Sequence, residues 1–272
     1  MRVIKYTGLY VILATGALIS VLPFVTAIFV SLKPARGLFS TPMWYPPLNP
    51  TLENFRSLFD GTSFALYFLV TIIVVVMVTT GQVVFSMLSA YAFARLRFWG
   101  RNTLFWAFIA TLMVPNIVTL IPLFLVMKDL GFINSVWGLA GPYIFGTPFG
   151  IFLARQFFLG IPHELLEAGR VDGSSEWGIF WRIVVPISRP LVGTLLIITS
   201  VQSWNNFLWP LIIGGTPRST VLTVGIGDLS TAVVPAYGPM MAAAVVVLAP
   251  ILAIFILFQR QIVSSISLSG IK

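Results

Sequence analysis

Long apolar runs, each able to cross a bilayer as a helix, occupy most of this 272-residue chain. A helix needs about 20 apolar residues to span a hydrocarbon core roughly 30 Å thick, because it rises about 1.5 Å per residue. Only 9% of the residues are charged, 58% are hydrophobic, and the mean hydropathy is +0.98. A β-barrel would instead show short segments of alternating polarity. The sequence therefore predicts an all-α polytopic membrane protein.

Charged and turn residues divide the apolar sequence into six predicted transmembrane helices, within a single domain that covers residues 1–272. The first run is longer than the apolar centre of a signal peptide, about 7–15 residues, so we expect it to be a retained span. The fourth is expected to kink or partly unwind, because several glycines and prolines interrupt it. The predicted spans are about 8–32, 64–92, 104–126, 134–159, 190–213 and 239–259, with a polar loop at 161–189.

Basic residues are concentrated on one side of these spans. The face that the two termini share carries eleven of the sixteen lysines and arginines, among them Arg95, Arg97 and Arg101. By the positive-inside rule, this face is expected to be cytoplasmic together with both termini. The net charge of +8 then reflects topology and contact with anionic membrane lipids, and no nucleic-acid partner is expected.

The polar loop concentrates half of the protein's acidic residues, four of the eight. Glu164 suits the first turn of a short helix, where a carboxylate is favoured by the positive end of the helix dipole. Asp172 and Gly173 are expected to end that helix, because glycine adopts a left-handed terminus without a Cβ clash. Ser174 is expected to cap a second short helix, which carries an aromatic stripe. From its charges alone, this segment would be an ordinary solvated amphipathic loop.

The same loop resembles the cytoplasmic signature, the EAA motif, of binding-protein-dependent ABC importer permeases. That signature reads Glu-Ala-Ala, three residues, glycine, nine residues, Ile-x-Leu-Pro. The matching positions are Glu167, Ala168, Gly169, Gly173, Ile183, Val185 and Pro186. Glycine replaces the second alanine and valine replaces the leucine, and both keep the position small or apolar. The spacing favours this family over a plain surface loop.

Other segments resemble the carbohydrate branch of these permeases, the MalG and UgpE-like proteins. They are residues 31–34, 50–55, 90–95 and 204–207, the last together with Pro210. The resemblance implies a MetI-like ABC permease fold and a pathway subunit of an ATP-driven importer. Such a subunit moves a sugar, here a di- or oligosaccharide, into the cytoplasm by alternating access. It also implies a multi-pass protein of the cell (plasma) membrane, the inner membrane, of a prokaryote.

The resemblance further implies partners: a second homologous permease subunit, which makes the pathway heterodimeric, two ATPase subunits and an extracytoplasmic solute-binding protein. ATP and Mg would be bound by the ATPases, because this chain has no G-x-x-x-x-G-K-[ST] sequence. The chain itself is expected to be no enzyme and to hold no cofactor or metal. Residues 162–182 would be the coupling helix that docks on an ATPase subunit. The residues implied in this coupling are Glu164, Glu167, Ala168, Gly169, Asp172, Gly173 and Pro186.

Polar residues within the spans are a second candidate site, because their burial is costly unless they find partners. The amides and aromatic rings of the fifth span are of the kind that binds sugars, although the same residues could equally tie helices together. The residues expected along the translocation pathway are Asn116, Gln202, Trp204, Asn205 and Asn206.

The connection at 214–236 is long and nearly free of charge. In related sugar permeases this connection faces the binding protein, so we expect it to contact such a partner. The alternative is a segment that packs on the chain or lies on the lipid surface. The expected contact residues are Val221, Thr223, Gly225 and Gly227.

An ion-coupled secondary transporter of a small polar solute is the alternative function. Such carriers usually contain intramembrane acids or inverted repeats, whereas all eight acids fall outside the predicted spans. The lone histidine, His163, lies in the polar loop, so neither a proton relay nor a metal site is expected. Co-purification of two nucleotide-binding subunits would favour the importer.

Overall fold

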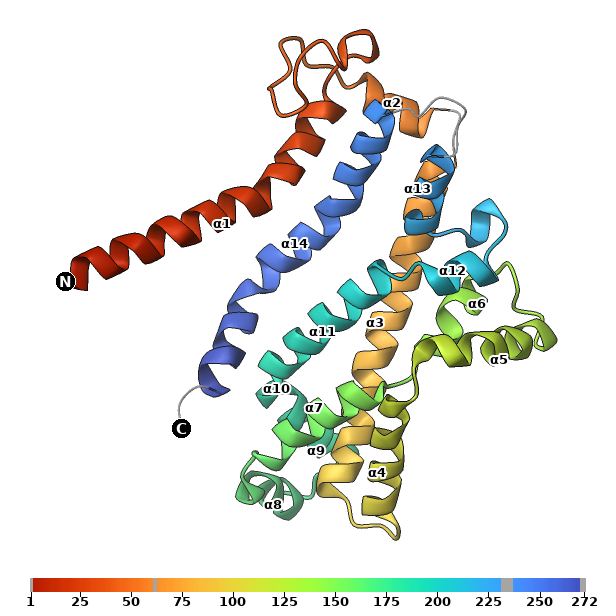
Figure 1. The fold of residues 1–272 in the computed structure, drawn as a ribbon. Helices are drawn as coiled ribbons and strands as arrows, with labels where there is room; N and C mark the ends of the chain where they lie inside the picture. Colours follow the sequence, from red (N-terminus) through yellow and green to blue (C-terminus); the bar gives the residue numbers. More distant parts are fainter. Residues whose placement is uncertain (1, 61–62, 231–236, 270–272) are drawn as a thin grey trace. The chain divides into compact units, whose positions relative to one another are not determined.

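The computed structural model describes residues 2–60, 63–230 and 237–269, and every regular element within these ranges is helical (Figure 1). The chain divides into two compact units, residues 1–66 with 224–252 and residues 67–223 with 253–272. The α-helices are α1 (Arg2–Ser31), α2 (Glu53–Phe59), α3 (Phe64–Arg95), α4 (Arg101–Ala110), α5 (Asn116–Asp129), α6 (Val136–Ala140), α7 (Pro148–Leu159), α8 (His163–Val171), α9 (Glu176–Ile179), α10 (Val185–Ile187), α11 (Arg189–Trp204), α12 (Leu208–Ile213), α13 (Leu222–Ser230) and α14 (Tyr237–Ser269). Short 3₁₀ segments lie at Ala35–Gly37, Thr111–Met113, Gly141–Tyr143 and Pro217–Ser219, and a π-helical segment lies at Phe180–Val184.

In the first unit, the segment that follows α1 is tied to α2. Asn54 is buried and donates hydrogen bonds from Nδ2 to the backbone oxygens of Ser31 and Lys33, both at 2.8 Å. A buried amide needs such partners, because leaving it unpaired costs about 1–3 kcal/mol. The bonds bring together residues 31–34 and 50–55, two of the segments that carry the family resemblance.

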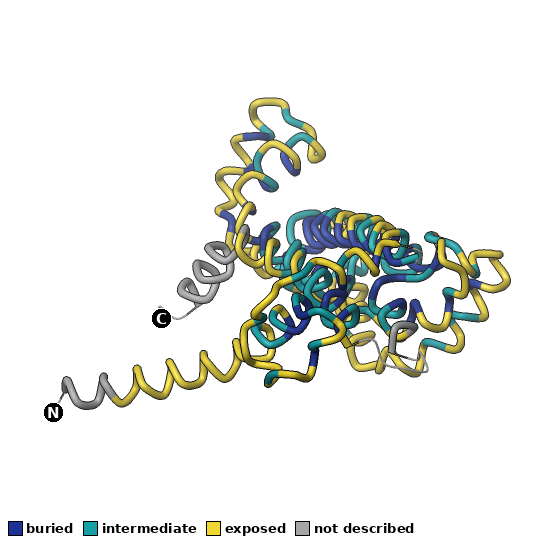
Figure 2. Tube along the Cα trace, turned by 90° about the horizontal axis from the view of Figure 1, so that it is seen from above, coloured by how far each residue is buried: buried dark blue, intermediate teal, exposed yellow. Residues whose placement is uncertain are grey.

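Three helices in the described part of the chain are long and apolar enough to cross a membrane alone: Gly8–Ser31, Phe64–Arg95 and Tyr237–Ile256. Three further pairs of helices pass the same test together but are bent, which gives up to six spans. In its most apolar stretch, 44% of α3 is buried, whereas none of the corresponding stretch of α1 is. Figure 2 shows α1 exposed over most of its described length. The apolar surface of α1 is therefore available to lipid or to a partner.

The predicted third span, 104–126, is not one straight helix. The chain bends by 102° between the end of α4, extended by its 3₁₀ turn, and the start of α5. Pro115 explains the bend, since it has no N–H to donate and its ring clashes with the carbonyl four residues earlier. Val114 is extended, with φ of −85° and ψ of 116°, as the residue before a proline prefers to be. The expectation of a continuous helix was wrong at this proline.

The fourth and fifth predicted spans are also divided. The expected kink in the fourth is present as a 42° bend before α7. In the fifth, α11 ends at Trp204 and α12 begins at Leu208. Pro210 explains this break, because its ring would clash with the carbonyl of Asn206, four residues earlier. The Asn206 carbonyl instead accepts a hydrogen bond from Thr223 Oγ1 at 2.8 Å.

The core of the second unit joins three spans to the polar loop. Its apolar side chains come from α3, α7, α11 and both helices of the loop. The loop therefore shares the hydrophobic core of the unit. The fully or nearly buried members of this cluster are Val83, Met87, Ala90, Tyr91, Ala154, Phe158, Ile161, Leu166, Ile179, Phe180, Val184, Leu191 and Leu195.

Candidate functional site

The polar loop folds as two short helices joined at Gly173. The N–H of Gly173 donates to the Arg170 carbonyl at 3.0 Å, and the N–H of Ser174 donates to the Gly169 carbonyl at 2.9 Å. This is the Schellman pattern of helix termination, which places a left-handed residue at the turn. Gly173 has a φ of +80°, so the predicted glycine elbow is confirmed.

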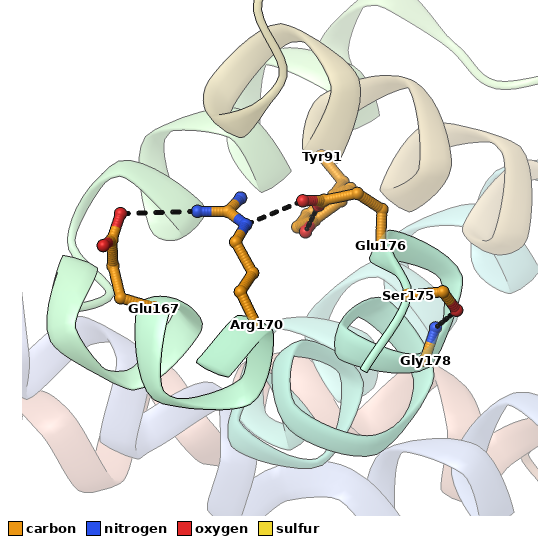
Figure 3. Close-up of polar contacts among 6 residues, drawn as sticks. All are labelled: Tyr91, Glu167, Arg170, Ser175, Glu176 and Gly178. Atoms are coloured by element: carbon orange, nitrogen blue, oxygen red, sulfur yellow. Dashed lines mark hydrogen bonds and ion pairs between the residues drawn. The ribbon is translucent and has the colours of Figure 1, made fainter. Parts of the chain in front are cut away.

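The second helix begins one residue later than expected. Ser175, not Ser174, is its cap, and Ser175 Oγ accepts the N–H of Gly178 at 3.2 Å (Figure 3). The helix then continues through the π-helical segment and α10 to Ile187. Pro186 lies in the last turn of this helix. The π bulge comes directly before α10, the turn in which the missing N–H of proline interrupts the hydrogen-bond ladder.

The inner side of α8 packs on the second loop helix. Leu166 is fully buried, and Gly169 is buried beside it. A Cβ at Gly169 would lie 2.8 Å from Ile183 Cδ1, so the glycine lets the two loop helices approach closely. Gly169 faces the interior of its own chain, and its implied part in coupling stays a prediction.

The outer side of the loop carries the other residues of the expected coupling set. The exposed members are Glu164, Glu167, Ala168, Asp172, Gly173 and Pro186. The side chain of Glu167 is 67% exposed, and it forms an ion pair with Arg170 at 3.6 Å. Glu164, Glu167 and Asp172 make the exposed surface of α8 and its C-terminal turn acidic, and we call this surface the outer face of the loop.

The aromatic stripe of the second loop helix divides between the two sides. Phe180 is buried in the core, whereas Trp177 and Trp181 are 61% and 41% exposed. The two tryptophan rings meet edge to face, with centroids 5.9 Å apart. Exposed tryptophans next to acidic side chains provide the aromatic area that protein partners commonly bury.

One carboxylate connects both loop helices to α3. Glu176 accepts the O–H of Tyr91 at 2.6 Å through Oε2 and the Nε–H of Arg170 at 2.8 Å through Oε1 (Figure 3). Arg170 in addition approaches Glu167. The hydrogen bond to Glu176 raises the pKa of Arg170 above its ordinary value, so the guanidinium remains charged. The contacts therefore run continuously from an exposed acid to a buried tyrosine.

Arg95, the last residue of α3, holds the point at which the chain leaves α7 and enters the loop. Its guanidinium donates from Nη2 to the carbonyls of Phe158 and Ile161. Carbonyls at a helix C-terminus have no donor within the helix, and a cation is favoured there by the helix dipole. Arg95 therefore stabilises the entrance to the loop.

A cavity of about 570 Å³ lies within the second unit, between α3, α5, α7, α11 and α12. This volume falls in the range of roughly 300–1,000 Å³ that is typical of small-molecule sites. Gln82 on its wall donates from Nε2 to the Tyr143 carbonyl at 2.8 Å. Four other polar side chains on the wall form no hydrogen bond within the ranges that the structure describes: Asn116, Gln202, Ser203 and Asn206.

The cavity brings together three of the five residues expected along the translocation pathway, Asn116, Gln202 and Asn206. Trp204 and Asn205 do not line it. Trp204 is 2% exposed and meets Phe68 edge to face, with centroids 6.2 Å apart. Asn205 donates from Nδ2 back to the Val201 carbonyl at 2.9 Å. Successive helical residues point about 100° apart, so neighbours in sequence need not share a wall.

The connection at 214–236 contains a helix, α13. The last six residues of the connection, 231–236, lie outside the described residues. Val221 is 4% exposed and lines the cavity, and Gly225 is also buried. Both residues are buried in this structure, and their contact with a binding protein stays a prediction. Thr223 is half-buried and bonds the break in the fifth span, while Gly227 is exposed.

The roles of Tyr91 and Arg95 were not predicted from the sequence. Both lie in the segment 90–95 that carries part of the family resemblance. They are four residues apart at the end of an apolar span, so they share one helix face. This spacing of two polar residues was the feature of the sequence that could have indicated a shared role. Their partners are more than sixty residues away in the sequence, and only the fold brings them together.

Comparison with known proteins agrees with this architecture. The family described as the inner membrane component of binding-protein-dependent transport systems matches residues 82–268. The chain of a bacterial ABC transporter involved in the import of the acidic polysaccharide alginate has the same fold, with a TM-score of 0.84 at 20% identity, covering 95% of this chain and 96% of that one.

Three relatives are similar along nearly the whole sequence. The arabinooligosaccharides transport system permease protein AraQ of Halalkalibacterium halodurans is 33% identical over 265 residues, which cover 94% of this chain and 92% of AraQ. The diacetylchitobiose uptake system permease protein NgcG of Streptomyces coelicolor is 30% identical, covering 95% and 86%. The sn-glycerol-3-phosphate transport system permease protein UgpE of Yersinia pestis is 32% identical, covering 93% of each. The chain thus belongs to the family of inner membrane components of binding-protein-dependent transport systems, the permease subunits of ABC importers.

Proposed function

We propose that this permease subunit imports a neutral sugar, a di- or oligosaccharide, by alternating access. It would work with a second permease subunit, two ATPase subunits and an extracytoplasmic binding protein. Relatives named for arabinooligosaccharides and diacetylchitobiose support a carbohydrate.

The observation that carries the proposal is the polar cavity of the second unit. Amide side chains both donate and accept hydrogen bonds, as sugar hydroxyls do, and three of them on this wall have no partner in the described chain. The rest of the wall consists of hydroxyl, aromatic and aliphatic groups. Such a lining suits a neutral polyol better than a phosphate, which arginine or lysine would bind.

The outer face of the loop is the proposed docking surface for an ATPase subunit. Glu167 is mostly exposed and would meet a basic group of that partner. The elbow at Gly173 and the buried face of α8 would make the loop stiff enough to transmit a push from the ATPase. ATP and Mg would be bound by the ATPases, where hydrolysis takes place.

The proposed orientation places this loop and both termini in the cytoplasm of a prokaryotic cell. The excess of arginine and lysine on this face supports that orientation. The opposite face would receive the binding protein, through the exposed residues Thr216, Pro217 and Arg218.

Uptake of labelled sugar by the complete complex in proteoliposomes tests the cavity. Asn206→Ala and Gln202→Ala should each lower uptake at subsaturating sugar by about two- to tenfold, the effect of losing one hydrogen bond. Asn205→Ala is the matched control, because that side chain bonds its own helix and does not line the cavity. Wild-type uptake by the first two variants would contradict the proposed pathway. Competition by glycerol phosphate but not by a neutral sugar would contradict the substrate class.

Charge reversal tests the docking surface. Glu167→Lys should weaken co-purification of the ATPase subunits and lower uptake, since it would place like charges together. Glu53→Lys, on the exposed first turn of α2, is the matched control and should leave both unchanged. Full assembly and uptake in Glu167→Lys would contradict this docking face.

A further inference from the structure

The last turn of α3 is fastened to the loop at two points. Tyr91 bonds Glu176 at the start of the second loop helix, and Arg95 bonds the carbonyls of Phe158 and Ile161, where the loop begins. Tyr91 and Arg95 are one helical turn apart and share a face of α3. The end of α3 is therefore hydrogen-bonded both to the start of the loop and to its second helix.

Glu176 is the point at which three helices meet. One of its oxygens accepts from Tyr91 on α3, and the other accepts from Arg170 on α8 (Figure 3). The Tyr91 ring is 4% exposed and packs against the rings of Phe158 and Phe180, with centroids 6.5 and 5.4 Å away. The position of the hydroxyl is thus fixed by packing, and the loop is held to it by one charged hydrogen bond.

The same helix also forms a wall of the cavity. Thr71, Val78 and Gln82 of α3 line it. Gln82 precedes Tyr91 by nine residues, about 13 Å along the helix axis at 1.5 Å per residue. No proline interrupts α3 between these positions, so the helix can move as a rigid rod.

We propose that Tyr91 is a positioning residue for transport, which makes α3 follow the loop when the loop is pushed. Its bond to Glu176 transmits the displacement of the loop to the cavity wall that carries Gln82. The inference rests on the proposed function, in which an ATPase docks on the outer face of the loop. A tyrosine that only stabilised the fold would make the same bond without affecting how ATP hydrolysis is coupled to transport.

The test uses the complete complex in proteoliposomes and measures sugar uptake and ATP hydrolysis in the same preparation. Tyr91→Phe keeps the ring and removes only the hydroxyl. It should lower the number of sugar molecules moved per ATP by about two- to tenfold, the effect of losing one hydrogen bond, while the ATPases stay bound. Tyr45→Phe is the matched control, since this exposed tyrosine lies in the connection after α1, and its ratio should equal that of the wild type.

A second variant separates coupling from stability. Glu176→Ala should lower the same ratio, and adding Tyr91→Phe to it should cause no further loss, because the two residues act through one bond. A wild-type ratio in Tyr91→Phe, with or without a lower melting temperature, would overturn the inference and leave the proposed function standing. Absence of ATP-driven sugar uptake in the wild-type complex would overturn the proposed function and the inference together.

Discussion

Replacing Gly173 with alanine should loosen the joint between the two loop helices without disturbing any other side chain. Gly173 has a φ of +80°, and a Cβ built there meets nothing within 4 Å. The cost is therefore that of holding an L-residue in the left-handed conformation, roughly 1–2 kcal/mol. This corresponds to a shift of about 5- to 30-fold in the equilibrium between the closed and the open turn.

Hydrogen exchange measured by mass spectrometry, on peptides that cover residues 163–180 in the purified complex, reports this opening. The amides of Gly173 and Ser174 donate the two bonds that close the turn, so their protection should fall by the same factor. Gly173→Asn should stay closer to the wild type, because asparagine enters the left-handed region more easily than alanine.

Gly100→Ala is the matched control for transport. Gly100 has a φ of +77° and equally open surroundings, but it lies in the connection between α3 and α4. Gly173→Ala should lower sugar uptake per ATP, and Gly100→Ala should not. Unchanged exchange in Gly173→Ala, or equal perturbation by asparagine and alanine, would refute the argument from backbone conformation.

Two further predictions concern packing and can be checked by thermal or denaturant unfolding. Gly81→Ala would place a Cβ 2.4 Å from the backbone oxygen of Ile144, so the backbones must separate, at a cost of about 1–3 kcal/mol. Gly141→Ala, with nothing within 4 Å of its Cβ, should cost much less. Leu166→Ala removes a fully buried side chain of the loop and should cost about 2–5 kcal/mol, whereas Leu165→Ala, at a position 46% exposed, should be nearly neutral. The reverse order in either pair would contradict the burial of these positions.

Local chemistry predicted much of the loop. The glycine elbow follows from conformational preference at Gly173 alone, and the structure has it. The roles of individual residues were harder to predict. Ser174 and Ser175 can both cap a helix, and only the observed hydrogen bond identifies Ser175 as the cap. The burial of Gly169 depends on where Ile183 lies, which no local pattern specifies.

The breaks in the spans show a different kind of limit. Membrane helices tolerate proline when neighbours satisfy the freed backbone groups, so a proline in an apolar run does not by itself specify a bend. Pro115 produces a bend of 102°, whereas α14 continues past Pro250. Likewise, the adjacent Asn205 and Asn206 look equivalent in the sequence, and they face different surroundings because α11 ends beside them.

Three non-helical residues separate α11 from α12, and Pro210 favours this break. Pro210 has no N–H to donate to the Asn206 carbonyl, which instead accepts the hydroxyl of Thr223, 17 residues later in the chain. Another residue at position 210 could donate an N–H to the Asn206 carbonyl and would favour a continuous helix through the turn that carries the Asn206 side chain. The polar wall of the cavity at Asn206 is thus associated with a hydrogen bond that Pro210 cannot form.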